Sequence, residues 1–186
     1  MPEIEKKALE LCQGKILDAG ACSGSHSLWL QKMGLDVCAA EISPGAVKVM
    51  QQRGIKNIIL QNVGTIKKMK FDTILMLMNG IGIVEDIGGL IIFLNHAKTL
   101  LNRNGQILLD SSDIVYLFDE VPPVDLKNYY GEIYYRMEFE GEQSNRFCWL
   151  YIDALTLQNI AEANGFDFAL ILTGSHYEYL ARLSLK

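Results

Sequence analysis

The sequence predicts a three-layer α/β fold in which helices cover both faces of a seven-stranded, mostly parallel sheet. Short apolar runs of strand length alternate with segments of helical period over the first 110 residues, which is the pattern of repeated β-α-β units. Glycines end most of the helical segments, as expected for left-handed helix ends. Two further apolar runs near the C-terminus, joined by a short turn, predict an antiparallel strand pair that closes the sheet.

The elements of the alternating region follow from local signals. The first helix has Ile4, Ala8 and Leu11 on one side, and the third begins with a capping hydroxyl and a proline, Ser43-Pro44. The fourth carries Leu90, Phe93, Leu94 and Ala97 at helical spacing. We therefore expect helices at residues 2–12, 25–33, 43–53 and 86–102, and strands at residues 15–18, 35–40, 57–60, 71–77 and 106–110.

After residue 110 the pattern changes. Residues 111–130 have no clear period and contain Pro122-Pro123, whereas 132–140 and 146–152 alternate in polarity around Gly141 and predict an inserted β-hairpin. A helix over 153–165 and strands over 166–172 and 179–185 complete the chain. We expect one domain over 1–186, with 111–152 as an irregular and hairpin excursion that could cover a substrate.

Composition narrows the class of partner. The chain has 186 residues, 49% hydrophobic and 21% charged, with a formal net charge of −5, which disfavours a nucleic-acid partner. Its apolar runs are too short to span a bilayer. The four cysteines and three histidines are scattered, so we expect no metal site and a reducing, cytoplasmic location.

The most informative stretch is the turn after the first strand, residues 17–25. Gly20 lets a ligand approach the backbone closely, and the helix start that follows offers backbone N–H groups beneath it. Ligands of open parallel sheets lie beyond the carboxyl ends of the strands. Glu41 ends the second strand, where a carboxylate can accept both hydroxyls of a ribose. The turn and the acid together indicate an adenosine site.

Two cofactor classes share this geometry. A nicotinamide enzyme would have glycines at 20, 22 and 25, but this chain has Gly20, Cys22 and Ser25. Asp18, Gly20 and Gly24 instead resemble the first motif of the class I S-adenosylmethionine-dependent methyltransferases, D-x-G-x-G-x-G. Cys22 replaces the middle glycine and narrows the space for the cofactor.

Further stretches extend the resemblance over about residues 15–110 and the last twenty. Residues 40–43 resemble the second motif, 61–63 the segment after the third strand, and 101–106 the turn into the fifth. The resemblance implies a Rossmann-like fold and S-adenosylmethionine as cofactor. It also implies that Asp18, Gly20, Ala21, Cys22 and Gly24 hold its methionine end, Glu41 its ribose, Ile42, Asn62 and Val63 its adenine, and the backbone near Asn79 its amine.

The expected reaction is in-line displacement of the methyl group by a small-molecule acceptor, neutral or cationic. Enzymes that methylate the exocyclic amines of bases, or glutamine amides, resemble [DN]-P-P-[YF] after strand four. Residues 78–82 lack both prolines, which disfavours that chemistry. No catalytic residue is assigned. The substrate-facing candidates come from strand ends and the excursion: Ser111, Ser112, Asp113, Tyr135, Trp149 and His176. A non-catalytic adenosine-binding module and an NAD(P)-dependent oxidoreductase are the alternatives, and the oligomeric state stays open.

Overall fold

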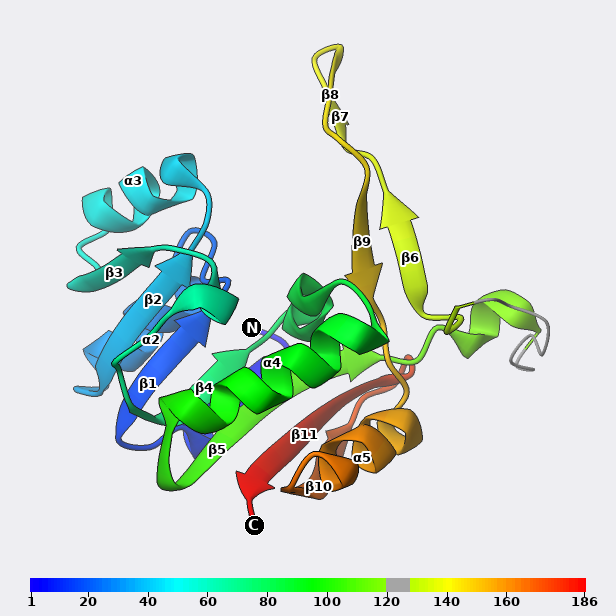
Figure 1. Cartoon of the computed structure of the whole chain (residues 1–186). Helices are drawn as coiled ribbons and strands as arrows, with labels where there is room; N and C mark the ends of the chain where they lie inside the picture. Colours follow the sequence, from blue (N-terminus) through cyan, green and yellow to red (C-terminus); the bar gives the residue numbers. More distant parts are fainter. Residues whose placement is uncertain (120–127) are drawn as a thin grey trace.

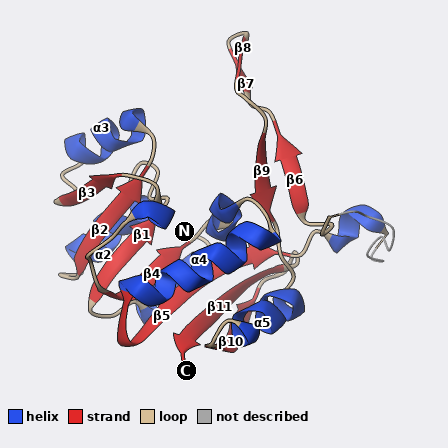
Figure 2. Ribbon diagram, viewed as in Figure 1, coloured by secondary structure: helices blue, strands red, loops and turns tan. Residues whose placement is uncertain are grey.

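A seven-stranded sheet forms the centre of the structure, a computed structural model that describes residues 1–119 and 128–186 (Figures 1 and 2). The strand order is β10-β11-β5-β4-β1-β2-β3. Strand β11 runs antiparallel to both neighbours, and the pairs from β5 to β3 are parallel. The strands span Lys15–Ala19 (β1), Asp36–Glu41 (β2), Asn57–Leu60 (β3), Phe71–Met76 (β4), Leu101–Ser112 (β5), Phe166–Thr173 (β10) and Glu178–Leu185 (β11). The predicted fold class is confirmed.

Helices cover both faces of this sheet, so its central strands are buried on both sides. Alternate residues of β1 face opposite layers: Ile16 packs in a cluster with Leu9 and Leu30, whereas Leu17 packs in a cluster with Leu90. The first face carries α1 (Glu3–Leu11), α2 (Ser25–Lys32) and α3 (Pro44–Gln52), and the second carries α4 (Ile87–Leu100) and α5 (Ala154–Ala163).

The predicted hairpin leaves the sheet and projects beyond the carboxyl ends of the parallel strands (Figure 1). Its base pairs β6 (Glu132–Tyr135) with β9 (Phe147–Leu150), and its tip pairs β7 (Glu138–Phe139) with β8 (Glu142–Gln143). Before it lies the short 3-10 helix η3 (Val115–Phe118). Pro122-Pro123, part of the predicted irregular stretch, lies outside the described residues.

Three local features differ from the sequence-based expectation. Strand β5 begins at Leu101, directly after α4, rather than at Gln106. The expected left-handed turn survives as an irregularity inside this strand, with Asn104 at a φ of 66°. Two short 3-10 helices at strand ends were not expected, η1 (Val63–Thr65) after β3 and η2 (Gly80–Val84) after β4.

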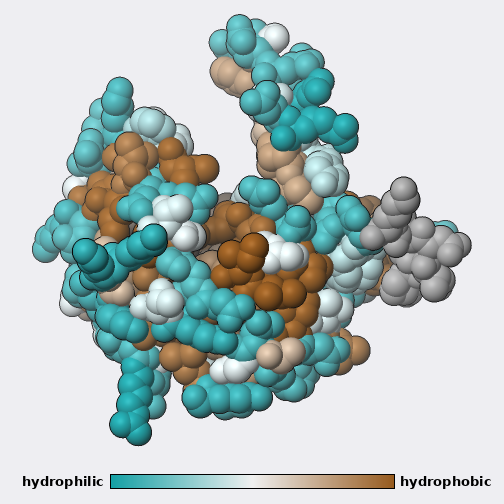
Figure 3. Space-filling model, viewed as in Figure 1, coloured by the Kyte–Doolittle hydropathy of each residue, from teal (hydrophilic) through white to brown (hydrophobic). Residues whose placement is uncertain are grey.

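Apolar side chains also reach the surface over α4 (Figure 3), including Ile91 and Ile92. None of the described helices is long and apolar enough to cross a membrane.

A buried hydroxyl fixes the sheet centre to the loop before β1. The Thr73 side chain, fully buried in β4, donates to the Gln13 carbonyl at 3.0 Å and accepts the Gln13 N–H at 3.2 Å. It also accepts from Nε2 of Gln106 on β5 at 3.3 Å. These bonds hold the loop between α1 and β1 against the adjacent strands β4 and β5.

We expect Thr73→Val to lower the free energy of unfolding by about 1–3 kcal/mol, because it keeps the side-chain shape but leaves buried polar groups unpaired. Urea unfolding measures the loss. The matched control is Thr99→Val on the exposed side of α4, which should change stability by less than about 0.5 kcal/mol. Equal losses in the two variants would contradict this role for Thr73.

Candidate functional site

The turn between β1 and α2 is fixed to the end of β2 by its own backbone. The N–H groups of Gly20 and Ala21 both donate to the Ala40 carbonyl, at 2.9 and 3.0 Å, and the Gly24 N–H donates to Ala21 at 2.8 Å. These three N–H groups are therefore already paired with backbone carbonyls. They are not the N–H groups of the first turn of α2, which the sequence analysis expected beneath a ligand. Gly20 and Gly24 both have a φ of 77°, the left-handed region that glycine adopts without strain.

The Glu41 carboxylate connects the end of β2 to this turn. One oxygen accepts the Cys22 N–H at 2.7 Å, and the other accepts the N–H groups of Ile42 and Ser43 at 2.8 and 2.9 Å. A carboxylate has about four acceptor positions, so Glu41 retains capacity for a hydroxyl donor. Cys22 itself has a φ of 50°, an uncommon value outside glycine.

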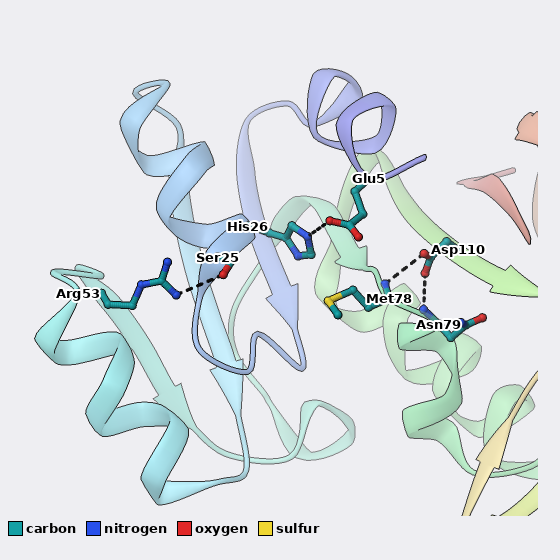
Figure 4. Close-up of polar contacts among 7 residues, drawn as sticks. All are labelled: Glu5, Ser25, His26, Arg53, Met78, Asn79 and Asp110. Atoms are coloured by element: carbon teal, nitrogen blue, oxygen red, sulfur yellow. Dashed lines mark hydrogen bonds and ion pairs between the residues drawn. The ribbon is translucent and has the colours of Figure 1, made fainter. Parts of the chain in front are cut away.

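The outer side of the same turn is held by α3 and the loop after it (Figure 4). Arg53 Nη1 donates to the Ser23 carbonyl at 2.7 Å and to the Ser25 hydroxyl at 3.2 Å. A Cβ atom at Gly24 would lie 2.8 Å from Cγ of Met50, so only glycine fits there. The turn is therefore rigid on both sides.

Asp18 lies beneath the turn rather than at its surface. It is 3% exposed, and its Oδ2 accepts a 2.6 Å hydrogen bond from the Ser27 hydroxyl on α2. Burial raises the pKa of this carboxyl, and the Ser27 hydrogen bond opposes the rise. In this position Asp18 couples β1 to α2.

A cavity of about 460 Å³, here called the hairpin cavity, opens between this turn and the projecting hairpin. Its volume lies within the usual range for small-molecule sites. Figure 3 shows the molecule hollowed between α3 and the hairpin. Its walls come from the β1–α2 turn, the ends of β2 and β3, η2 and β9: Gly20, Cys22, Ala40, Glu41, Ile42, Gln61, Asn62, Val63, Gly82, Ile83, Glu85, Phe147, Cys148 and Trp149.

Two apolar side chains and one amide flank the acid in this cavity. Ile42 is 67% exposed, unusual for so large an apolar side chain, whereas Val63 is nearly buried. Asn62 Oδ1 accepts the Gly64 N–H at 2.8 Å. The Asn62 amide nitrogen donates to no other described residue, so it can serve a ligand acceptor.

Trp149 of β9 closes the cavity on the hairpin side. Its Nε1 donates to the Asn79 carbonyl at the end of β4, at 3.2 Å. The indole lies directly on the backbone of Gly82, since a Cβ atom there would fall 1.9 Å from Nε1. The hairpin is also anchored by Glu132, whose Oε1 accepts the Ile87 N–H at 3.1 Å. The hairpin wall is thus fixed to the sheet edge.

The structure brings seven of the residues singled out from the sequence to the hairpin cavity: Gly20, Cys22, Glu41, Ile42, Asn62, Val63 and Trp149. It does not bring Asp18, Ala21, Gly24 or Asn79 to the cavity lining.

The five other candidates from the sequence make local contacts outside the lining of the hairpin cavity. The Ser111 hydroxyl is fully buried and accepts the Ile152 N–H at 3.0 Å. Asp113 Oδ1 accepts the Val115 N–H and the Tyr130 hydroxyl, at 2.9 and 2.6 Å. Tyr135 donates to the Tyr151 hydroxyl at 3.1 Å, and the His176 backbone donates to Glu178 in the turn before β11. Ser112 pairs with Glu178 in the sheet.

Several lining residues escaped the sequence analysis, chiefly Gly82, Glu85, Phe147 and Cys148. The segment after β4 offered a signal, because Gly82 follows Asn79 closely and glycine permits close approach of another group. Phe147 and Cys148 adjoin the candidate Trp149, but nothing local says that β9 reaches the sheet edge.

Beside the cavity, Asp110 at the end of β5 holds the end of β4 (Figure 4). Its two carboxylate oxygens accept the N–H groups of Met78 and Asn79, at 3.1 and 2.8 Å. Burial raises the pKa of Asp110 to about 6, and these backbone N–H groups oppose the rise. Met78 and Asn79 have left-handed φ values of 64° and 53°, so this contact stabilises a strained connection.

Comparison with known proteins places this geometry in context. A family model described as a methyltransferase domain matches residues 17–109. An S-adenosylmethionine-dependent methyltransferase from Bacteroides fragilis, solved with S-adenosyl-L-homocysteine, shares 45% identity and a TM-score of 0.91, over 100% of this chain and 78% of that one. No curated protein matches the sequence.

More distant structures share the fold. The glycopeptide N-methyltransferase MtfA, solved with S-adenosylhomocysteine, has 14% identity and a TM-score of 0.71, over 99% of this chain and 89% of that one. The 1,6-didemethyltoxoflavin-N1-methyltransferase of Burkholderia thailandensis has 14% identity and a TM-score of 0.65, over 98% and 78%.

We expect Gly82→Ala to push the Trp149 indole off the turn, because the added methyl group occupies its place. The loss should be about 1–3 kcal/mol in the free energy of unfolding. It should come with a red shift of Trp149 emission, read in a Trp29→Phe background. Gly45→Ala on α3 is the control, since its Cβ would meet only Ser43 Oγ at 3.7 Å. An unshifted spectrum in Gly82→Ala would contradict the packing.

We expect the Asp110 carboxyl to titrate near pH 6 in the folded protein, about two units above its ordinary value. Because the folded state binds this proton more tightly, the contribution to stability is complete below the unfolded pKa of 3.8 and is lost as the pH rises through about 6. Carbon-13 NMR measures the titration. Relative to Asp110→Asn, the wild type should lose stability from pH 4 to 7, and a gain would contradict the assignment.

Proposed function

The chain belongs to the S-adenosylmethionine-dependent methyltransferases, and on that premise we propose that it methylates a small-molecule acceptor with its cofactor seated in the hairpin cavity. We treat residues 1–186 as a single methyltransferase domain that works in the cytoplasm. The observation that carries the proposal is Glu41, a carboxylate that lines a ligand-sized cavity and is fixed by three backbone N–H groups.

The residues of this cavity fit an adenosyl group. The spare acceptor capacity of Glu41 suits ribose hydroxyls. Ile42 and Val63 offer apolar surface to a planar base. The unpaired Asn62 amide N–H suits a ring nitrogen of adenine, and Asn62 Oδ1, which accepts one N–H, has a second lone pair for the adenine amino group.

The cofactor supplies an activated methyl group, so the protein's main contribution is alignment and exclusion of water. Alignment of donor and acceptor can remove about 7–11 kcal/mol from a barrier at best. The rigid β1–α2 turn provides the fixed floor, and Trp149, bonded to the Asn79 carbonyl, shields the open side. No side chain is assigned as a general base.

A small acceptor is supported by two observations. The distant Burkholderia thailandensis structure holds 1,6-didemethyltoxoflavin together with S-adenosylhomocysteine, so this fold accommodates small acceptors. The net charge of −5 disfavours a polyanionic substrate. The nicotinamide alternative loses its support, because the similar proteins named above are methyltransferases. The non-catalytic alternative draws on Cys22, whose side chain takes up space in the cavity.

Calorimetry with S-adenosylhomocysteine tests the cofactor site. We expect the wild type to bind, Glu41→Gln to bind about tenfold more weakly or worse because it loses charge-assisted hydrogen bonds, and Cys22→Gly to bind more tightly because the cavity widens. Glu138→Gln, at the exposed hairpin tip, is the matched control and should bind like the wild type.

Absence of heat with S-adenosylhomocysteine at high micromolar concentration, alongside NADH binding, would overturn the assignment. Binding without methyl transfer to any compound in a metabolite panel would favour the non-catalytic module instead.

A further inference from the structure

A second and larger cavity, about 860 Å³, opens on the same edge of the sheet; we call it the acidic cavity. It lies between the start of α1, the ends of β4 and β5, and the turn between β10 and β11. This is the carboxyl edge of the parallel strands, where ligands of open α/β sheets lie. The residues that line it are different from those that line the hairpin cavity, and the proposed cofactor site does not include it.

The charged residues in the described lining of this cavity are all negative. Four of its residues are carboxylates, and none is Lys, Arg or His: the acids are Glu3, Glu5, Asp110 and Glu178. They come from three separate segments, which the fold brings together; Figure 4 shows Glu5 and Asp110 on neighbouring elements. A concave site lined by one sign of charge concentrates ligands of the opposite sign.

Part of this charge has a local structural role. Glu5 is paired with Nε2 of His26 at 2.9 Å, and Glu178 Oε2 accepts the His176 N–H at 2.7 Å. Both oxygens of Asp110 accept backbone N–H groups. Glu3 is exposed at the start of α1. His176 also acts on Glu178 through its charge, so Glu3 and Asp110 are the two carboxylates that face no cationic partner among the described residues. The charged side chains of the lining itself are all acidic.

An unsatisfied acceptor in the same lining points to a ligand that donates hydrogen bonds. The side-chain oxygen of Asn79 is buried and accepts no hydrogen bond from any described residue. Buried polar atoms are nearly always paired, so an unpaired one calls for a missing partner. A carbonyl-type oxygen beside carboxylates can be satisfied only by a donor such as an N–H group.

Asn79 also connects the two cavities. Asn79 belongs to the lining of the acidic cavity, and its backbone carbonyl accepts from Trp149, which lines the hairpin cavity. The two spaces are thus separated by the short segment at the end of β4. A ligand in the acidic cavity lies next to one in the hairpin cavity, as donor and acceptor of a methyl group must.

We propose that the acidic cavity binds the methyl acceptor and that this acceptor carries a protonated amine, recognised by the carboxylates of the lining and by Asn79. The inference rests on the proposed function, since it takes the hairpin cavity as the cofactor site. The ammonium is the group by which the acceptor is recognised. The amino group of the cofactor is also an ammonium and is the competing ligand for these carboxylates. The test below distinguishes the two ligands.

The test uses the full chain saturated with S-adenosylhomocysteine and matched probe pairs in NMR shift titrations. The pairs are phenethylamine with 2-phenylethanol, and 1,4-diaminobutane with 1,4-butanediol. We expect both amines to bind and both alcohols to bind at least fivefold more weakly, with shifts at residues 78–79 and 172–178. The variant Glu3→Gln/Glu178→Gln should weaken amine binding about fivefold or more and leave the S-adenosylhomocysteine affinity unchanged.

The matched control is Glu10→Gln/Glu138→Gln, which removes the same charge from exposed positions outside the cavity and should behave like the wild type. Amines that bind no better than their alcohols would overturn the proposal. So would a Glu3→Gln/Glu178→Gln variant that loses S-adenosylhomocysteine affinity, because the cavity would then serve the cofactor's amine. If S-adenosylhomocysteine fails to bind the wild type, the proposed function fails. The comparison of amines with alcohols in the protein without S-adenosylhomocysteine then decides whether the acidic cavity binds an ammonium group.

Discussion

The carboxylate of Glu41 accepts three backbone N–H groups, and the geometry of the site depends on that contact. Through Cys22 it holds the β1–α2 turn against the end of β2, and through Ile42 and Ser43 it bends the chain into α3. The parallel pairing of β1 with β2 brings these segments together, since Ala19 lies opposite Ala40. A local interaction thus becomes a site because a sheet places two strand ends side by side.

The second wall of the hairpin cavity has a different origin. It is supplied by an excursion that leaves β5 and returns before α5, and it reaches the sheet edge through Trp149 and Glu132. Trp149 donates to Asn79, just before η2, and Glu132 accepts from Ile87, at the start of α4. The Trp149 indole packs on Gly82 within η2 and leaves no room there for a side chain. The floor of the cavity is therefore built by the sheet and its turns, whereas its cover is built by the excursion between β5 and α5.

The parts of this molecule that could be predicted from sequence are those encoded locally. Strand and helix order followed from periodicity, and the turn with Glu41 followed from residues within one β-α-β unit. The burial of Ser111 did not follow, because its partner, the Ile152 N–H, is far away in the chain. The burial of Asp18 beneath the turn did not follow either, although its partner Ser27 belongs to the next helix. The acidic cavity was equally invisible, since Glu3, Asp110 and Glu178 are far apart in the chain.

Cys22 shows why a departure from the family motif need not destroy the site. A left-handed residue other than glycine costs about 1–2 kcal/mol, whereas a hydrogen bond to a charged acceptor contributes about 1.5–3 kcal/mol. The Cys22 N–H makes such a bond with Glu41. The bond offsets the backbone strain, so the turn keeps the shape that a glycine would give it. What the thiol changes is the space above the turn, because its side chain is exposed and lines the cavity. The substitution therefore bears on how tightly a ligand fits and leaves the path of the chain unchanged.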